Sequence, residues 1–253
     1  VGAGVATALA QKGIQLITAT VGDAVKRVDT LNNSNRAFQN MGVSAKDVKK
    51  NMSLLNDSIN GLPTSLDSAV SGVQLLTSST GDMGQSTKVF AAMNDAILGF
   101  GGSSEQVQNA VTQLSQAFSN GKVDAETWNS MIDSGMGPAL NALAKQMGIT
   151  SGELKSGLSD GSISVKQFQD ALIDLDKNGG GGLQSLQKIA QDSTAGISTS
   201  AANLRTAFVR NLANVIGAFQ PVIVSALGAV TSFVNTFGSI LTPIVKAIGD
   251  GFK

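Results

Sequence analysis

The chain has 253 residues, 18 basic against 18 acidic side chains, and no His, Cys or Tyr. Without imidazole or thiolate ligands, zinc, haem and iron–sulfur sites are excluded. Ser-His-Asp and Cys-His catalytic arrangements are excluded for the same reason. Only 4% of the residues are aromatic and 42% are apolar, which indicates a core of small side chains between helices. The zero net charge gives no overall attraction to nucleic acid, so we expect no sequence-specific nucleic-acid partner.

Charge and periodicity divide the chain into three predicted domains, which cover residues 1–43, 44–197 and 198–253. Residues 1–60 and residues 201–253 each carry a net charge of +3, and the part between them carries −6. A length of this size suits one or two folded domains. We interpret the chain as a piece of a longer protein and identify no signal peptide in it.

The first part carries apolar side chains at alternating spacings of three and four residues, with one Asn at an a-like position. These residues are Ile14, Ile17, Val21, Ala24, Val28, Leu31, Asn35 and Phe38. The pattern is typical of a coiled-coil helix that needs a parallel partner. Over so few heptads, an amphipathic helix on a globular core gives the same pattern, and both interpretations stay open. Gly42 is expected to end the helix.

The middle part, over roughly residues 44–195, is predicted to be a series of short helices. Ser103 with Gln106 and Ser164 with Gln167 have the spacing of capping boxes, in which each side chain bonds the other residue's backbone N–H. Sustained period-two alternation is absent, so we predict no strands. The four glycines at 179–182 predict a flexible joint.

Two stretches of the middle part repeat the same pattern 40 residues apart. Asn-Gly and Asp-Gly favour the left-handed backbone that ends a helix, a β-branched residue fills the corner, and Asp or Ser caps the next helix. The matched positions are Asn120-Gly121 with Asp160-Gly161, Val123 with Ile163, and Asp124 with Ser164. A weaker third copy lies at residues 80–83. The repetition predicts a duplicated helix–turn–helix hairpin.

The last part holds an uncharged stretch, residues 211–245, with an apolar seam along one helical face. The seam residues are Leu212, Ile216, Phe219, Ile223, Leu227, Val230, Val234, Phe237, Leu241 and Val245. Their spacing is close to an eleven-residue repeat, which is typical of a nearly straight helical seam. We predict burial of this seam in a homo-oligomer, a trimer. The stretch also exceeds the roughly 20 residues that span a bilayer, so a membrane-active module is the alternative.

Catalytic, metal and cofactor sites are not predicted. Residues 99–104 are glycine-rich but lack the Lys of phosphate-binding loops, so they are interpreted as a loop that leads to a helix start. The three glutamates Glu105, Glu126 and Glu153 are placed in first turns of helices, where a negative charge favours the helix dipole. An envelope-degrading enzyme that uses Glu126 or Glu153 is the weakest hypothesis.

Asp160-Gly161 resembles the centre of an EF-hand loop. With Gly161 at the sixth loop position, Ser156, Leu158 and Gln167 stand where calcium needs carboxylate or amide oxygens. We therefore reject a calcium site at this turn.

Residues 62–199 resemble the tape measure domain of tail tape measure proteins from long-tailed bacteriophages and prophages. The similarity rests on four segments of this sequence: LPTSL (62–66), NDAILGFGGSSEQVQNAVTQLSQAFSNGKVDAETWNSMI (94–132), GPALNALAKQMG (137–148) and GLSDGSISVKQFQDALI (157–173). It covers a little over half of the chain. The resemblance implies a long helical molecule in the lumen of the tail tube, whose length sets the length of the tail.

The same resemblance implies the partners and the location. Expected partners are tail tube and tail tip proteins, tail assembly chaperones and, after release ahead of the DNA, the host membrane. Expected locations are the virion tail lumen, the host cytoplasm during assembly and the host membrane during infection. The predicted fold is all-α, with elongated or loosely packed helices, hairpins in the middle and coiled-coil-like terminal helices. Whether the middle helices pack compactly or string out inside a tube stays open.

Overall fold

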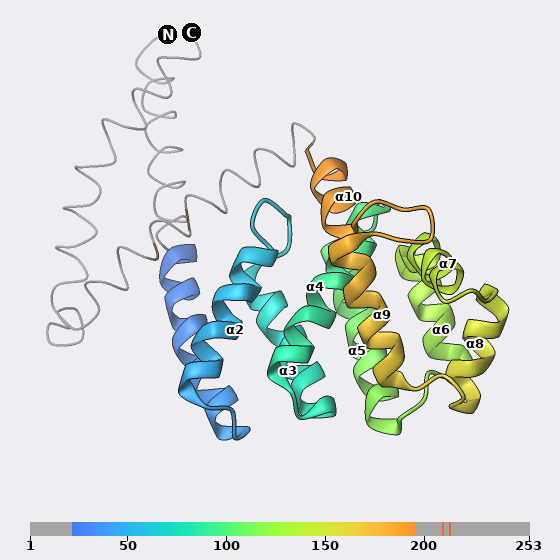
Figure 1. Ribbon diagram of the computed structural model, residues 1–253. Helices are drawn as coiled ribbons and strands as arrows, with labels where there is room; N and C mark the ends of the chain where they lie inside the picture. The colour runs from blue at the N-terminus through green and yellow to red at the C-terminus, as the bar shows by residue number, and fades with distance from the viewer. Residues whose placement is uncertain (1–21, 196–208, 210–212, 214–253) are drawn as a thin grey trace, which may run out of the picture. The chain divides into compact units, whose positions relative to one another are not determined.

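The computed structural model describes residues 22–195 together with Val209 and Ala213 (Figure 1). Over these residues the fold is all-α, as predicted. The chain forms two compact units. The first unit comprises Val1–Thr30 and Ala207–Lys253, of which residues 22–30, Val209 and Ala213 are described. The second unit, Leu31–Thr206, holds the helices discussed below.

Residues 22–40 are helical, and the helix stops just before Gly42, which has a φ of +88°. Of the predicted heptad positions, Ala24, Val28 and Phe38 are buried and Leu31 and Asn35 are half-buried. Phe38 belongs to the core of the second unit, so the C-terminal half of this helix follows the globular interpretation of the pattern. The positions before residue 22 lie outside the described residues.

The second unit continues with α-helices and one π-helical turn, joined by short loops (Figure 1). The elements are α2 (Ala45–Ser58), α3 (Leu66–Thr80), α4 (Met83–Gly99), α5 (Ser104–Asn120), α6 (Ala125–Met131), the π-helical turn η1 (Ile132–Met136), α7 (Gly137–Gln146), α8 (Ser151–Asp160), α9 (Val165–Asn178) and α10 (Leu186–Ser193).

Side chains at the helix starts explain why the elements begin where they do. Every α-helix from α2 to α10 except α7 begins after a Ser, Thr or Asp whose side-chain oxygen accepts a backbone N–H three residues on. These caps satisfy amides that have no partner within the helix. The predicted capping boxes at Ser103 and Ser164 are confirmed, and Thr150 with Glu153 forms a further one. Glu105 and Glu126 stand in first turns, as expected.

Helix α4 is the centre of the second unit, since α2, α3, α5, α9, α10 and η1 all pack against it. Its sequence explains this position, because buried residues lie on every face, including Phe90, Met93 and Ile97, which are fully buried. A helix that is apolar all round is stable only when it is covered on all sides. One continuous core runs from Phe38 to Ala190. The middle helices therefore pack together, which decides the question that the sequence left open.

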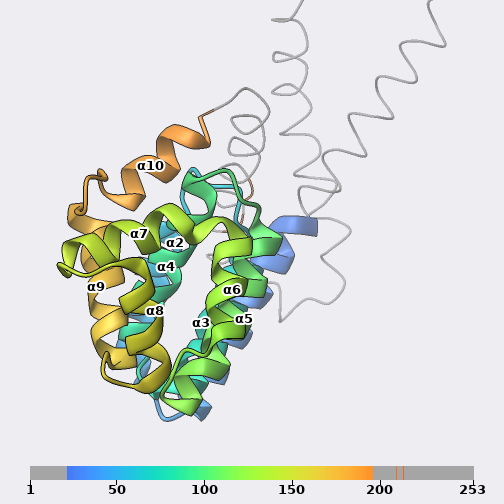
Figure 2. The same ribbon diagram turned by 90° about the vertical axis from the view of Figure 1, so that its right-hand side faces the viewer.

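Two hairpins, α5–α6 and α8–α9, match the predicted duplication. Gly121 and Gly161 end α5 and α8 in the left-handed conformation, with φ of +72° and +87°. The Val123 side chain is buried at the first corner, and its N–H donates to the carbonyl oxygen of Leu158 at 3.1 Å. The two turns lie at the same end of the unit (Figures 1 and 2). The weaker third copy is also confirmed, because Gly81 (φ +73°) ends α3 and Asp82 caps α4.

The glycine tract at 179–182 is an ordered turn, and the prediction of a flexible joint was wrong. Gly180 and Leu183 form a pair of backbone hydrogen bonds of 3.0 and 2.9 Å. The turn lies directly on α7, because a Cβ on Gly181 would stand 2.0 Å from the carbonyl oxygen of Ala142. Glycine is required here for close approach of two backbones as well as for positive φ.

Among the helices of the described residues, none is both long and apolar enough to cross a membrane. The uncharged stretch at 211–245 lies outside those residues apart from Ala213.

Candidate functional site

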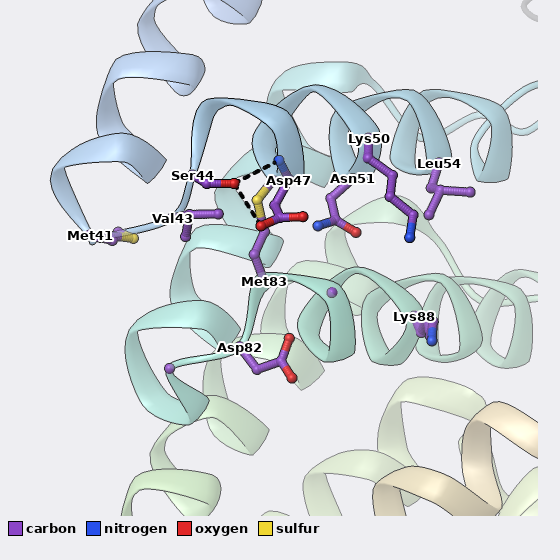
Figure 3. A pocket seen from close by; sticks show the side chains of 13 residues that line it. Met41, Val43, Ser44, Asp47, Lys50, Asn51, Leu54, Asp82, Met83 and Lys88 are labelled. Carbon is purple, nitrogen blue, oxygen red and sulfur yellow. Dashed lines mark hydrogen bonds between the residues drawn. The ribbon is translucent and has the colours of Figure 1, made fainter.

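A groove with a mixed polar and apolar lining runs between α2 and α4 of the second unit (Figure 3). It encloses about 560 Å³ and is lined by the chain before α2, one face of α2 and the first turns of α4. The lining residues are Met41, Gly42, Val43, Ser44, Asp47, Lys50, Asn51, Leu54, Gly81, Asp82, Met83, Gly84 and Lys88. The groove thus combines two helix starts with two lysines and exposed apolar side chains.

The helix starts place acidic groups in the groove near Ser44 and Asp82. Ser44 Oγ accepts the Asp47 N–H at 3.1 Å and donates to Asp47 Oδ2 at 2.6 Å (Figure 3). Asp82 Oδ1 accepts the Gln85 N–H at 2.9 Å. Both carboxylates therefore compensate helix-start amides, which carry partial positive charge.

Asn51 stands between these acidic groups and the lysines. It is only 7% exposed, and its carboxamide points from α2 toward α4 (Figure 3). Its Oδ1 lies 3.7 Å from the position that a Cβ on Gly84 would take. Among the described residues, no group hydrogen-bonds this carboxamide. A carboxamide offers two donors and an acceptor, and those of Asn51 face the groove.

A second polar feature, a carboxyl pair, is buried where α4 meets α9. Asp95 of α4 is 2% exposed, and its carboxyl group hydrogen-bonds that of Asp176 in α9. Burial raises the pKa of Asp95 to about 9, and the neighbouring Asp176 adds to the rise. Burial also raises the pKa of Asp176, to about 6, against hydrogen bonds from Asp95 and from the Gln187 N–H at the start of α10.

The pair holds a proton in the folded protein. Asp176 Oδ1 is buried and receives no hydrogen bond from an N–H or hydroxyl group of the described residues. A proton on Asp95 supplies the missing donor, since two adjacent carboxylates do not both ionise in a buried site. Asn94 Nδ2 donates weakly to Asp95 Oδ1, at 3.4 Å. The shared proton therefore joins α4 to α9, and the Gln187 N–H joins Asp176 to the start of α10.

Paired carboxyls can act as general acid and base, but this pair has no room for a substrate. A catalytic dyad needs a substrate atom within hydrogen-bonding distance, and Asp95 is closed off by the core. Neither acid lines the groove between α2 and α4. Within the described part of the chain, no three acidic side chains gather as a metal site. The pair is a structural link between helices.

The predicted seam, from Leu212 to Val245, lies outside the described residues, so the structure does not test it. The rejected sites take ordinary structural roles. Asp160 Oδ1 accepts the Ser162 N–H at 2.8 Å within the α8–α9 turn, and hydrogen bonds from the Ser162 side chain and backbone lower the Asp160 pKa. Residues 100–103 form a loop that leads to the Ser103 cap.

Sequence reasoning missed both the groove and the carboxyl pair. The pair left a detectable signal, because Asp95 interrupts the apolar run AAMNDAILG of α4 and Asp176 follows Leu172 by four residues, on its core-facing stripe. The groove left none, because it forms between two helices whose facing residues, such as Lys50 and Lys88, are far apart in sequence.

The second unit is an all-α domain whose packed helices are connected by buried polar groups. A family model described as tape measure protein matches residues 22–216. The chain belongs to the tape measure protein family, and it is a structural component of a phage tail. Members of this family act as structural proteins, not as enzymes. No curated protein and no solved structure matches the chain.

Proposed function

We propose that this chain is part of a ruler and scaffold that occupies the lumen of a phage tail during assembly and leaves the tube before the DNA. The observation that carries the proposal is the family match over residues 22–216. The all-α structure supports it, since helices supply length at about 1.5 Å per residue. On this proposal, tube proteins, tail tip proteins and assembly chaperones are its partners.

The packed second unit sharpens the ruler model. Hairpins fold back on themselves, so this unit adds less length per residue than an extended helix does. We therefore place the length-setting property in helical segments outside it, with the uncharged stretch at 211–245 as the part contributed by this chain.

Tail length tests the ruler. In the phage that encodes the chain, an in-frame deletion of residues 212–244 removes three eleven-residue repeats and keeps the phase of the seam. Tails are expected to shorten by roughly 50 Å, from the 1.5 Å rise per residue of a helix. Ser232→Asp, which lies off the seam and leaves its length unchanged, is the matched control. Unchanged tail length in the deletion phage, measured by electron microscopy of intact virions, contradicts the proposal for this segment.

Self-association through the seam, as a trimer, is part of the same proposal. A charge placed in an apolar contact surface removes its driving force. Leu227→Asp and Phe237→Asp are expected to lower the mass of the purified chain in analytical ultracentrifugation. Ser232→Asp, off the seam, is the control. An equal mass for parent and both seam variants contradicts the oligomer.

A membrane-inserting module that aids genome passage is the second candidate, favoured by the 35 uncharged residues at 211–245. A stretch above about 20 residues is long enough to span a bilayer. The isolated segment is then expected to bind liposomes and release a trapped dye at neutral pH. Absence of partitioning into liposomes contradicts this candidate and leaves the ruler proposal intact.

A further inference from the structure

Two lysines, Lys50 of α2 and Lys88 of α4, line the same end of the groove (Figure 3). Lys50 extends from α2 toward α4 on the side of the groove where Lys88 stands (Figure 3). Lys50 has no ion pair or hydrogen bond with any described residue. Lys88 is exposed and lies near Asp170 of α9, whose pKa it helps to lower after Lys166 and Gln85. The lysine end of the groove therefore carries positive charge, of which that of Lys88 is partly offset by Asp170 and that of Lys50 has no ion-pair partner among the described residues.

Apolar side chains flank this charge. Leu54 and Met41, which both line the groove, are 43% and 44% exposed. They are two of the four large apolar side chains that stand exposed in the described part of the chain; the others are Val25 and Ile132. Protein contact surfaces combine apolar area with polar groups that fix orientation.

The unpartnered carboxamide of Asn51 lies between the lysines and the acidic end. The residue is 7% exposed, it lines the groove, and its carboxamide has no hydrogen-bond partner among the described residues. A carboxamide can donate to and accept from one peptide group of a bound chain. A volume of about 560 Å³ falls in the range of pockets that hold a ligand or a few side chains.

From these observations, we infer that the groove between α2 and α4 binds an acidic segment of a partner protein. A Glu or Asp carboxylate of the partner bridges Lys50 and Lys88, Asn51 binds a main-chain amide, and an apolar neighbour packs on Leu54. Asp47 and Asp82 at the opposite end repel further acid, so the bound segment carries its basic residue there. This inference concerns binding by the second unit and is independent of the ruler proposal.

The direct test is fluorescence anisotropy with the full chain and two labelled peptides. The first probe is Lys-Ala-Ala-Leu-Glu-Ala-Leu-Glu with blocked ends, and the second carries Gln in place of both Glu. The chain is expected to bind the Glu peptide roughly tenfold more tightly than the Gln peptide, which corresponds to about 1.4 kcal/mol. The difference is expected to shrink at high salt, because exposed charges are screened.

Variants on the same two helices localise the binding. The double variant Lys50→Gln with Lys88→Gln is expected to abolish the preference for the Glu peptide. Lys46→Gln with Lys49→Gln removes the same charge from α2 at positions that do not line the groove, and is expected to leave the preference unchanged.

Gly84 allows the groove to be filled directly. A Cβ at this helical position would stand 3.3 Å from Asp82 Oδ1 and 3.7 Å from Asn51 Oδ1, so a larger side chain there enters the groove. Gly84→Leu is expected to abolish binding of the Glu peptide while the thermal unfolding transition is retained.

Three results overturn the inference. The first is equal binding of the two peptides, or no binding of either, by the native chain. The second is a Glu preference that survives in the Lys50→Gln, Lys88→Gln variant. The third is self-association in sedimentation experiments that disappears in this variant, because the occupant is then a second copy of the chain.

Discussion

The buried pair of Asp95 and Asp176 makes the stability of the second unit depend on pH in an unusual direction. The perturbation is Asp95→Asn, which keeps a hydrogen-bond donor toward Asp176 but cannot ionise. Because burial raises the pKa of Asp95 to about 9, the folded protein holds a proton that the unfolded chain has released. This stabilising effect is complete below the ordinary pKa, near pH 4, and is lost as the pH rises toward 9.

The size of this loss of stability follows from the raised pKa of Asp95. Between pH 5 and pH 7 the folded state binds one more proton at Asp95, so the free energy of unfolding falls by about 1.4 kcal/mol per pH unit. The expected loss from Asp95 across this window is about 2 to 3 kcal/mol, and release of the Asp176 proton near pH 6 adds about 1 kcal/mol.

Other groups with a shifted pKa add little to the pH dependence of stability between pH 5 and 7. The chain has no His or Cys, whose ordinary pKa values lie nearest to it. Hydrogen bonds lower the pKa of Asp124, Glu153, Asp160 and Asp170. Carboxyl groups with lowered pKa stabilise the fold above their ordinary pKa, and this contribution is lost at acid pH. They are therefore ionised in both states between pH 5 and 7 and add no slope.

Urea unfolding at several pH values measures the slope. Trp128 is the only tryptophan of the chain, and its indole is buried in the second unit, so its fluorescence reports on that unit. The native chain is expected to lose stability from pH 5 to 7, and Asp95→Asn is expected to flatten the dependence. Asp57→Asn, an exposed change on α2, is the control. A native slope of zero or of opposite sign, or a full slope in Asp95→Asn, refutes the reasoning.

Three further predictions use the same urea assay. Gly181→Ala is expected to lower the free energy of unfolding by about 3 kcal/mol, because the new Cβ would stand 2.0 Å from the Ala142 carbonyl oxygen. Gly148→Ala is also at positive φ but in open space, and is expected to lower it by about 1 kcal/mol. Equal losses contradict the close-approach argument. Ser103→Ala removes a capping box and is expected to lose about 1 kcal/mol, and an unchanged midpoint contradicts that role. Phe168→Ala, at a fully buried position, is expected to lose about 3 to 5 kcal/mol; a loss below 1 kcal/mol shows that α9 does not pack on the core.

Local signals explain how much of the fold the sequence predicted. Helix starts at Ser103 and Ser164 and the turn at Gly121 depend on hydrogen bonds and backbone conformations within a few residues, so the pattern alone located them. Strands were excluded for the same reason, since their period-two pattern is absent. The apolar faces of the helices predicted burial but not which helix covers which.

The errors and omissions depend on tertiary contacts. Four successive glycines have the same composition in a linker and in a packed turn, and the Gly180–Leu183 hydrogen bonds and the approach of Gly181 to the Ala142 carbonyl form only in the fold. Asp95 shows in the sequence only as a charge within an apolar run, and its raised pKa comes from the docking of α9 and α10 over α4. Lys50 and Lys88 become neighbours in the groove only because α2 lies along α4.

Amide hydrogen exchange of the full chain tests the central claim, that residues 31–195 form one packed unit around α4 and not a string of separate helices. Amides in the core of a unit exchange only through its global unfolding. The α4 amides are predicted to show an opening free energy equal to the unfolding free energy reported by Trp128. Exchange of α4 as fast as that of a solvent-exposed isolated helix contradicts the account, because the core from Phe38 to Ala190 then does not form.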